Sequence, residues 1–221
     1  MVWVGQFNII GGQVQEEGPR TGIFLDRNRG EPDVSHLYIL VEPALPDSEE
    51  FCPQVIEVIG QLFHESKLSL TGGLLRALRS AHESLREWNR KSLKEHRVAT
   101  GLSCLAVRDD EAYLAQVGPA LAYARQRGRT RLAVPHIPDA QGPLGLYEDF
   151  WPAFRRYDLS AGDRLLLVTS NLATAIGAEE VDATLALPPE HCLPKLYQGA
   201  RQLTDCAALL LAFDSSGQGS P

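Results

Sequence analysis

Basic side chains gather in two stretches of a chain whose overall charge is negative. Residues 76–97 carry seven arginines and lysines against Glu83, Glu87 and Glu95. Residues 125–131 carry an arginine at every second position. Guanidinium groups bind phosphate and carboxylate in a two-pronged geometry. The two Arg-rich faces therefore predict a protein partner that is acidic or phosphorylated, with an ordinary solvated charged face as the alternative.

The cysteines and histidines are spaced too widely to build a metal site. Cys52, Cys104, Cys192 and Cys206 include no CxxC pair, so we expect neither a zinc site nor a disulfide framework, and a reducing cytoplasm as the setting. The six histidines show no i, i+4 pairing, which disfavours a histidine metal site. The GxSxG, GxxxxGK(S/T) and GxGxxG motifs are absent, which leaves hydrolase-elbow, P-loop and Rossmann chemistry without support.

The composition describes an ordinary globular protein. The chain has 221 residues, of which 44% are hydrophobic and 22% charged, which excludes a wholly disordered chain, a collagen and a coiled coil. The net charge of −7 argues against a nucleic-acid partner. The longest apolar run, residues 206–213, is far shorter than the about 20 residues that cross a membrane as a helix. We therefore expect no membrane partner and a buried strand at this run.

Two helices are expected near the middle of the first half of the chain. Apolar residues repeat at helical spacing over residues 53–66 and 71–93. The second helix carries one apolar stripe that we expect to be buried against a sheet, made of Leu74, Leu78, Ala81, Leu85 and Trp88.

Strands precede and follow this helical pair. Residues 98–134 alternate as a meander of three or four antiparallel strands, and the proline-rich residues 135–160 are expected to form an ordered loop. The remaining expected elements are strands at 2–10, 36–41, 163–169 and 206–213 and helices within 178–202. This order predicts an α+β fold of two packed antiparallel sheets, with the first helical pair on one outer face and the later helices on the other. We expect one domain over residues 1–214 and a disordered tail at 215–221.

Three phrases, in this order along the chain, resemble the metal-dependent serine/threonine protein phosphatases, the PPM or type 2C family. Residues 100–107 and 112–123 resemble the central hairpins of the family. Residues 159–171 resemble its D-L-x-x-G-D-R-L-L-L-C-S-D-G-L phrase, and residues 199–211 resemble its G-S-x-D-N-x-T-V-V-V-V phrase. The resemblance spans nearly all of residues 1–214 and implies a four-layer α-β-β-α sandwich.

The family holds two Mn²⁺ or Mg²⁺ ions on a cluster of aspartates, where they supply a bound hydroxide and clamp the phosphoryl oxygens. The resemblance implies that metal ligands would fall at Glu42, Asn171 and Asp205. Only Asp205 keeps the aspartate of the family, because Glu42 is longer and Asn171 carries an amide in place of a carboxylate.

The first metal motif of the family is matched less closely. The resemblance places Gly22 near the aspartate that bridges the two metals, with Asp26 nearby, and it places Arg20 at the arginine that binds phosphate. Glycine offers no side chain to a metal. We therefore expect the metal positions to be vestigial and no residue to be catalytic.

These positions predict a PPM-type domain without catalysis, which serves as a binding or regulatory module and needs no cofactor. One alternative is an active but atypical phosphatase that removes phosphate from serine and threonine with Mn²⁺ or Mg²⁺. Another is an unrelated α+β protein. Simpler roles also exist for the candidate residues: Glu42 as a solvent-exposed carboxylate at a strand end, Asn171 as a helix N-cap and Asp205 as a turn residue.

Overall fold

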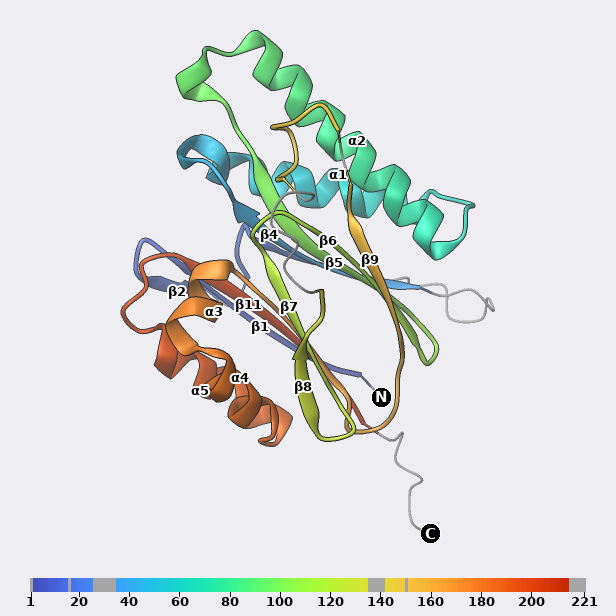
Figure 1. The fold of residues 1–221 in the computed structure, drawn as a ribbon, viewed down its shortest axis with the longest axis vertical. Coiled ribbons are helices and arrows are strands. Elements are labelled where there is room, and N and C mark those ends of the chain that lie inside the picture. The colour runs from blue at the N-terminus through green and yellow to red at the C-terminus, as the bar shows by residue number, and fades with distance from the viewer. Residues whose placement is uncertain (1, 16, 26–34, 135–141, 150, 215–221) are drawn as a thin grey trace.

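The computed structural model describes residues 2–15, 17–25, 35–134, 142–149 and 151–214. In them the chain forms two antiparallel sheets that pack face to face and carry helices on both outer sides (Figure 1). The predicted α+β fold, a four-layer α-β-β-α sandwich, is confirmed. The expected disordered tail and the carboxylate of Asp26 lie outside the described residues.

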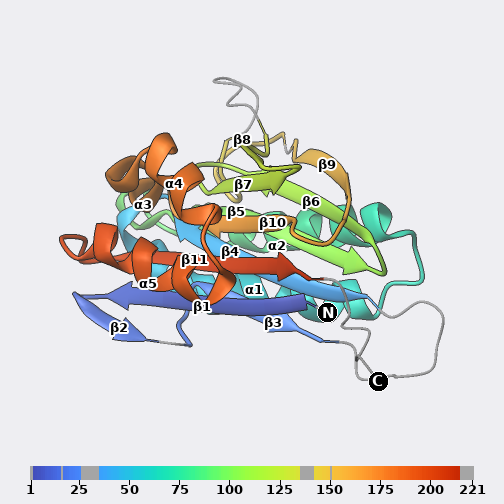
Figure 2. The same cartoon turned by 90° about the horizontal axis from the view of Figure 1, so that it is seen from below.

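The first sheet has six strands and is built around the first and last strands of the fold. Figure 2 shows β1 and β11 lying side by side in this sheet. In their antiparallel register, Phe7 of β1 lies opposite Ala208 of β11. The order across the sheet is β2 (Gln13–Gln15), β1 (Val2–Ile10), β11 (Cys206–Phe213), β10 (Arg164–Val168), β7 (Leu121–Gln126) and β8 (Arg129–Leu132).

The second sheet has five strands that are more local in sequence. Their order is β3 (Thr21–Phe24), β4 (His36–Pro43), β5 (Thr100–Arg108), β6 (Glu111–Val117) and β9 (Ala153–Asp158).

The predicted meander is divided between the two sheets. β5 and β6 pair in the second sheet, whereas β7 and β8 pair in the first. The chain crosses between them at Gly118, whose φ of 68° lies in the left-handed region that glycine adopts without strain. The prediction of a loop through residue 160 is wrong for β9, which pairs with β6 although Arg155 and Arg156 make its sequence polar.

The helices cover the sheets as predicted. α1 (Cys52–His64) and α2 (Leu70–Lys91) pack on the second sheet. The first sheet carries α4 (Ala178–Leu185) and α5 (Pro189–Ala200), together with the short helix α3 (Ser170–Ile176). Two 3₁₀ turns, η1 (Pro46–Phe51) and η2 (Lys94–His96), flank α1 and α2. Within the described residues, no helix is both long enough and apolar enough to cross a membrane.

The apolar stripe of α2 is buried except at one end. Leu74, Leu78 and Leu85 lie in the core between α1, α2 and the second sheet. The expected burial of Trp88 is wrong, because its side chain is 51% exposed. Its ring instead packs edge-to-face on Phe51 of η1, with 5.0 Å between the ring centroids.

Candidate functional site

The candidate site lies at one end of the sandwich, where strands from both sheets meet. Glu42 stands near the end of β4, and Arg20 directly precedes β3. A hydrogen bond from the backbone N–H of Val41 to the carbonyl oxygen of Arg20, 2.8 Å long, holds these two strand ends together. In the other sheet, α3 begins directly after β10 and Asp205 directly precedes β11. The fold therefore gathers residues that are far apart in sequence.

Glu42 is buried between the sheets rather than exposed to water. It shares the inner face of β4 with Tyr38 and Leu40 and is only 8% exposed. The backbone N–H of Ser170 donates to Glu42 Oε2 at 2.8 Å, and the Ser170 hydroxyl donates to Oε1 at 2.5 Å. Burial raises the pKa of Glu42, although the Ser170 hydrogen bonds and the charge of Arg20 oppose the shift. The simpler role of an exposed strand-end carboxylate is therefore wrong.

Arg20 forms a buried ion pair with a residue that the sequence did not single out. Its Nε donates to Glu49 Oε1 at 3.0 Å, and its Nη2 donates to Glu49 Oε2 at 2.6 Å. Asp205 Oδ1 lies 3.8 Å from Nη2. Burial alone would lower the pKa of Arg20, but the hydrogen bonds and charge of Glu49 outweigh it and raise the pKa. The guanidinium predicted to bind phosphate thus holds a carboxylate of its own chain.

Asp205 and Asn171 hold the turn into β11. Asp205 Oδ1 accepts a 3.0 Å hydrogen bond from the backbone N–H of Gly11, which is the largest reason that the pKa of Asp205 is lowered. Asn171 Nδ2 donates to the Asp205 carbonyl oxygen at 2.5 Å. The simpler role of Asn171 as an N-cap is wrong, because Thr169 occupies the N-cap of α3 and Asn171 lies inside the helix.

Gly22 faces away from these residues. A Cβ on Gly22 would lie 2.3 Å from Ile56 Cγ2 of α1, so this position of β3 faces the helical layer. Its neighbour Thr21 faces the interior between the sheets, where its hydroxyl accepts a 3.0 Å hydrogen bond from Asn8. The glycine predicted to lie near a metal-bridging aspartate is therefore required for helix packing, since any side chain would collide with α1.

These side chains, as placed, do not fit a pair of divalent cations. Both oxygens of Glu42 already accept hydrogen bonds from Ser170, and both oxygens of Glu49 accept hydrogen bonds from Arg20. Hard cations need several free anionic oxygens close together. In the described part of the chain, no group of three or more histidine, cysteine, aspartate and glutamate side chains could hold a metal ion.

Sequence reasoning brought the right region together but missed the partners. Arg20, Glu42, Asn171 and Asp205 do lie at one end of the sandwich. The missed residues are Glu49, Ser170 and Gly11, which supply the hydrogen bonds. No local signal in the sequence links Glu49 to Arg20, which lies 29 residues away.

Solved structures that share this fold include serine/threonine phosphatases. The serine/threonine phosphatase of S. agalactiae matches with a TM-score of 0.78 and 14% identity, over 97% of this chain and 100% of that one. Stp1 from Staphylococcus aureus matches with a TM-score of 0.78 and 16% identity, over 98% and 96%. PstP from Mycobacterium tuberculosis matches with a TM-score of 0.70 and 12% identity, over 97% of this chain and 99% of that one. A structure of a PstP catalytic domain holds two manganese ions. No family model and no curated protein matches the sequence. At these identities the likeness establishes the fold, which is that of the PPM-type phosphatases.

Proposed function

We propose that this PPM-fold protein is a binding or regulatory module without metal-dependent phosphatase activity. The observation that carries the proposal is the Arg20 guanidinium, which stands between Glu49 and Asp205 at the end of the sandwich. A guanidinium is a permanent cation. Because it is paired with both oxygens of Glu49, this guanidinium is not free to bind a substrate phosphate and the Glu49 carboxylate is not free to bind metal.

The hydrogen bonds of the site support the same proposal. Metal binding would require Glu42 to leave the Ser170 N–H and hydroxyl, and it would place divalent charge beside Arg20. Each lost hydrogen bond to a charged group costs roughly 1.5–3 kcal/mol. Mg²⁺ in particular sheds its water reluctantly and demands near-ideal geometry. A site with these competing interactions is a poor ligand set for either ion.

Basic surfaces support a protein partner for the module. Arg76, Arg79 and Arg90 are exposed along α2 in the face over residues 76–97, although Lys91 in the same face pairs with Glu87 at 2.8 Å. The face over residues 125–131 exposes three of its four arginines. Arginine forks bind phosphate and carboxylate well. The partner that fits both faces is an acidic or phosphorylated protein.

The proposal places the protein in the cytoplasm. All four cysteines are buried free thiols. Free cysteines without a disulfide framework are typical of reducing compartments.

A metal titration and a turnover assay together test the proposed absence of metal-dependent phosphatase activity. We expect Mn²⁺ and Mg²⁺ to give no binding heat by calorimetry and chelator to leave the melting temperature unchanged, because a ligand stabilises only the state that binds it. Hydrolysis of p-nitrophenyl phosphate and of a phosphothreonine peptide with millimolar Mn²⁺ should match a buffer blank. An active PPM-fold phosphatase assayed in parallel is the positive control. Mn²⁺-dependent turnover that is lost in Asp205→Ala would overturn the proposal in favour of an atypical phosphatase.

A further inference from the structure

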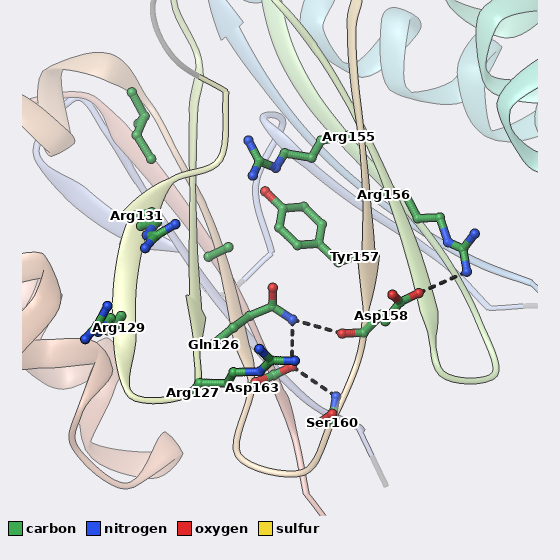
Figure 3. Close-up of a pocket in the computed structure, with 12 residues that line it drawn as sticks. Gln126, Arg127, Arg129, Arg131, Arg155, Arg156, Tyr157, Asp158, Ser160 and Asp163 are labelled. Atoms are coloured by element: carbon green, nitrogen blue, oxygen red, sulfur yellow. Dashed lines mark hydrogen bonds and ion pairs between the residues drawn. The ribbon is translucent and has the colours of Figure 1, made fainter.

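A pocket opens at the edge of the sandwich, at the opposite end of the strands from Arg20 and Asp205. This edge pocket has a volume of about 700 Å³ and lies between β8 and β9, the outer strands of the two sheets (Figure 3). The strand register sets the two ends apart: Val168 pairs with Leu121 near the candidate site, whereas Arg164 pairs with Arg125 at the pocket end.

Three arginines face the interior of the edge pocket. On β8, Arg131 pairs with Ala124 and Arg129 pairs with Gln126, and Ala124 belongs to the core between the sheets. Residues directly opposite in an antiparallel pair point to the same side, so both arginines lie on the inner face. On β9, Arg155 is two residues from the buried Tyr157 and shares its face. Figure 3 shows Arg155 and Tyr157 projecting from β9 toward β8.

Within the described ranges, no acidic side chain pairs with these three arginines. Among the described residues, Arg129, Arg131 and Arg155 make no ion pair, whereas Arg156 on the outer face of β9 pairs with Glu111 at 2.5 Å. The two acidic residues of the edge pocket are engaged elsewhere. Asp158 pairs with Arg156 at 2.9 Å.

Asp163, the other acidic residue of the edge pocket, is held by neighbours of its own. Its Oδ2 accepts hydrogen bonds from Gln126 Nε2 at 2.8 Å and from the Ser160 N–H at 3.0 Å. Arg125, although adjacent in sequence to the pocket residues, points to the other side of the sheet and pairs with Asp182 of α4 at 2.6 Å. As far as the described residues go, the pocket therefore has three guanidinium groups without an acidic partner along its lining.

We propose that the edge pocket binds a phosphate monoester, with Arg129, Arg131 and Arg155 as its ligands. A phosphate monoester carries a charge of about −1.5 to −2 at pH 7 and three acceptor oxygens, which suits three arginine forks better than a single carboxylate does. The volume lies within the range of about 300–1,000 Å³ for small-ligand sites. Tyr157, on the same face of β9 as Arg155, adds an apolar wall for the group that bears the phosphate.

The inference rests on the binding role proposed above, and it gives that role a site and a ligand chemistry. The same chemistry is carried by a phosphorylated protein side chain and by a small organic phosphate. The experiment separates these two sources.

Arginine side-chain NMR measures the binding directly. The probes are phenyl phosphate and a short alanine-rich peptide with one phosphoserine, each added to the protein in chelator-containing buffer at pH 7.5. We expect both probes to shift the Nε–Hε resonances of Arg129, Arg131 and Arg155. Phenyl sulfate, an isosteric monoanion, and phenyl phosphate at pH 5, below its second pKa of about 6, should bind more weakly. A peptide affinity at least tenfold above that of phenyl phosphate assigns the ligand to a protein segment, and equal affinities assign it to a small organic phosphate.

Variants locate the site and guard against a general charge effect. The double variant Arg129→Gln/Arg131→Gln should weaken phenyl phosphate binding by about 100-fold, since each arginine bond to a charged group contributes about tenfold or more. Arg201→Gln removes one like charge at an exposed position just after α5, outside both Arg-rich faces, and should change phenyl phosphate binding less than twofold. Both variants are at exposed positions, and an unchanged melting temperature confirms folding.

Several results would overturn the inference. Wild-type affinity in the double variant, an equal loss in Arg201→Gln, or shifts confined to Arg20 would each place the phosphate outside the edge pocket. These results leave the assay for metal-dependent turnover untouched. Conversely, Mn²⁺-dependent hydrolysis together with shifts at Arg129 and Arg131 would defeat the proposed inactivity while the edge pocket stands.

Discussion

Replacing Glu49 by alanine removes the carboxylate that balances a buried guanidinium. The Arg20 side chain is 6% exposed and that of Glu49 is 34% exposed. Breaking a fully buried ion pair by removing one partner costs about 3–5 kcal/mol, whereas a fully exposed pair contributes about 0–1 kcal/mol. Here Glu49 is partly solvated, and Asp205 remains 3.8 Å from Arg20. We therefore expect Glu49→Ala to lower the free energy of unfolding by about 2–3 kcal/mol.

Urea denaturation at pH 7 measures this change. Glu50→Ala is the matched control, because Glu50 is an exposed acid in the same turn, and it should cost less than about 0.5 kcal/mol. The double variant Arg20→Met/Glu49→Leu should be less destabilised than the sum of the two single changes, since apolar replacement of both partners leaves no buried charge unpaired.

A loss below about 0.5 kcal/mol in Glu49→Ala, equal to that of Glu50→Ala, would refute this reasoning. It would mean that solvent or Asp205 alone compensates the Arg20 charge. The guanidinium would then be free to meet another anion, and the main support for an inactive site would be lost.

Three further outcomes are expected from urea denaturation. Leu85→Ala should cost about 2–5 kcal/mol, because Leu85 is 4% exposed in the core beneath α2; a cost under about 1 kcal/mol would contradict its burial. Asn89→Ala should cost about 2–4 kcal/mol, because it leaves the buried N–H and carbonyl of Val98 and the carbonyl of Gly145 without their amide partner. Asn89→Asp should cost at least as much, because it sets a buried carboxylate oxygen against those two carbonyl oxygens, and a cost below about 1 kcal/mol in either variant would contradict this account. Burial raises the pKa of Glu42, so the folded state keeps a proton that the unfolded chain has lost, and this residue makes stability fall as pH rises from about 4 through its folded pKa. The free energy of unfolding of Glu42→Gln should therefore rise relative to that of the wild type as the pH increases over this range. A parallel pH dependence of the two proteins would count against a raised pKa of Glu42.

The order of the elements was predictable because the local signals agreed with each other. The spacing of apolar residues in α1 and α2 indicates only helices, and the apolar runs of β4 and β11 indicate only strands. β9 was missed because four of its six residues face solvent or the edge pocket, so alternation was hidden. Trp88 continues the apolar stripe of α2 but stands where that helix packs on η1 rather than on a sheet.

The candidate site was predictable in position and not in chemistry. The resemblance brought Glu42, Asn171 and Asp205 to one place, since each lies next to a strand end. It could not reveal that Ser170 holds Glu42 across 128 residues of sequence, because such pairing depends on how the two sheets face each other. The facing of Gly22 was equally hidden, since a shift of one residue along a strand reverses the side to which a residue points.

The pairing of β1 with β11 has a consequence for how the protein is made. Gly11 and Asp205, which close the end of this strand pair, are 194 residues apart. At about 5–20 residues per second, a ribosome needs on the order of 10–40 seconds to add the partner after β1 has been synthesised. During that interval an apolar strand lacks its partner on that side, which is a condition that favours misassembly. The six-stranded sheet can therefore close only after β11 has been synthesised through residue 213, whereas the core of the five-stranded sheet, β4 to β6 with α1 and α2, has all its parts by residue 117.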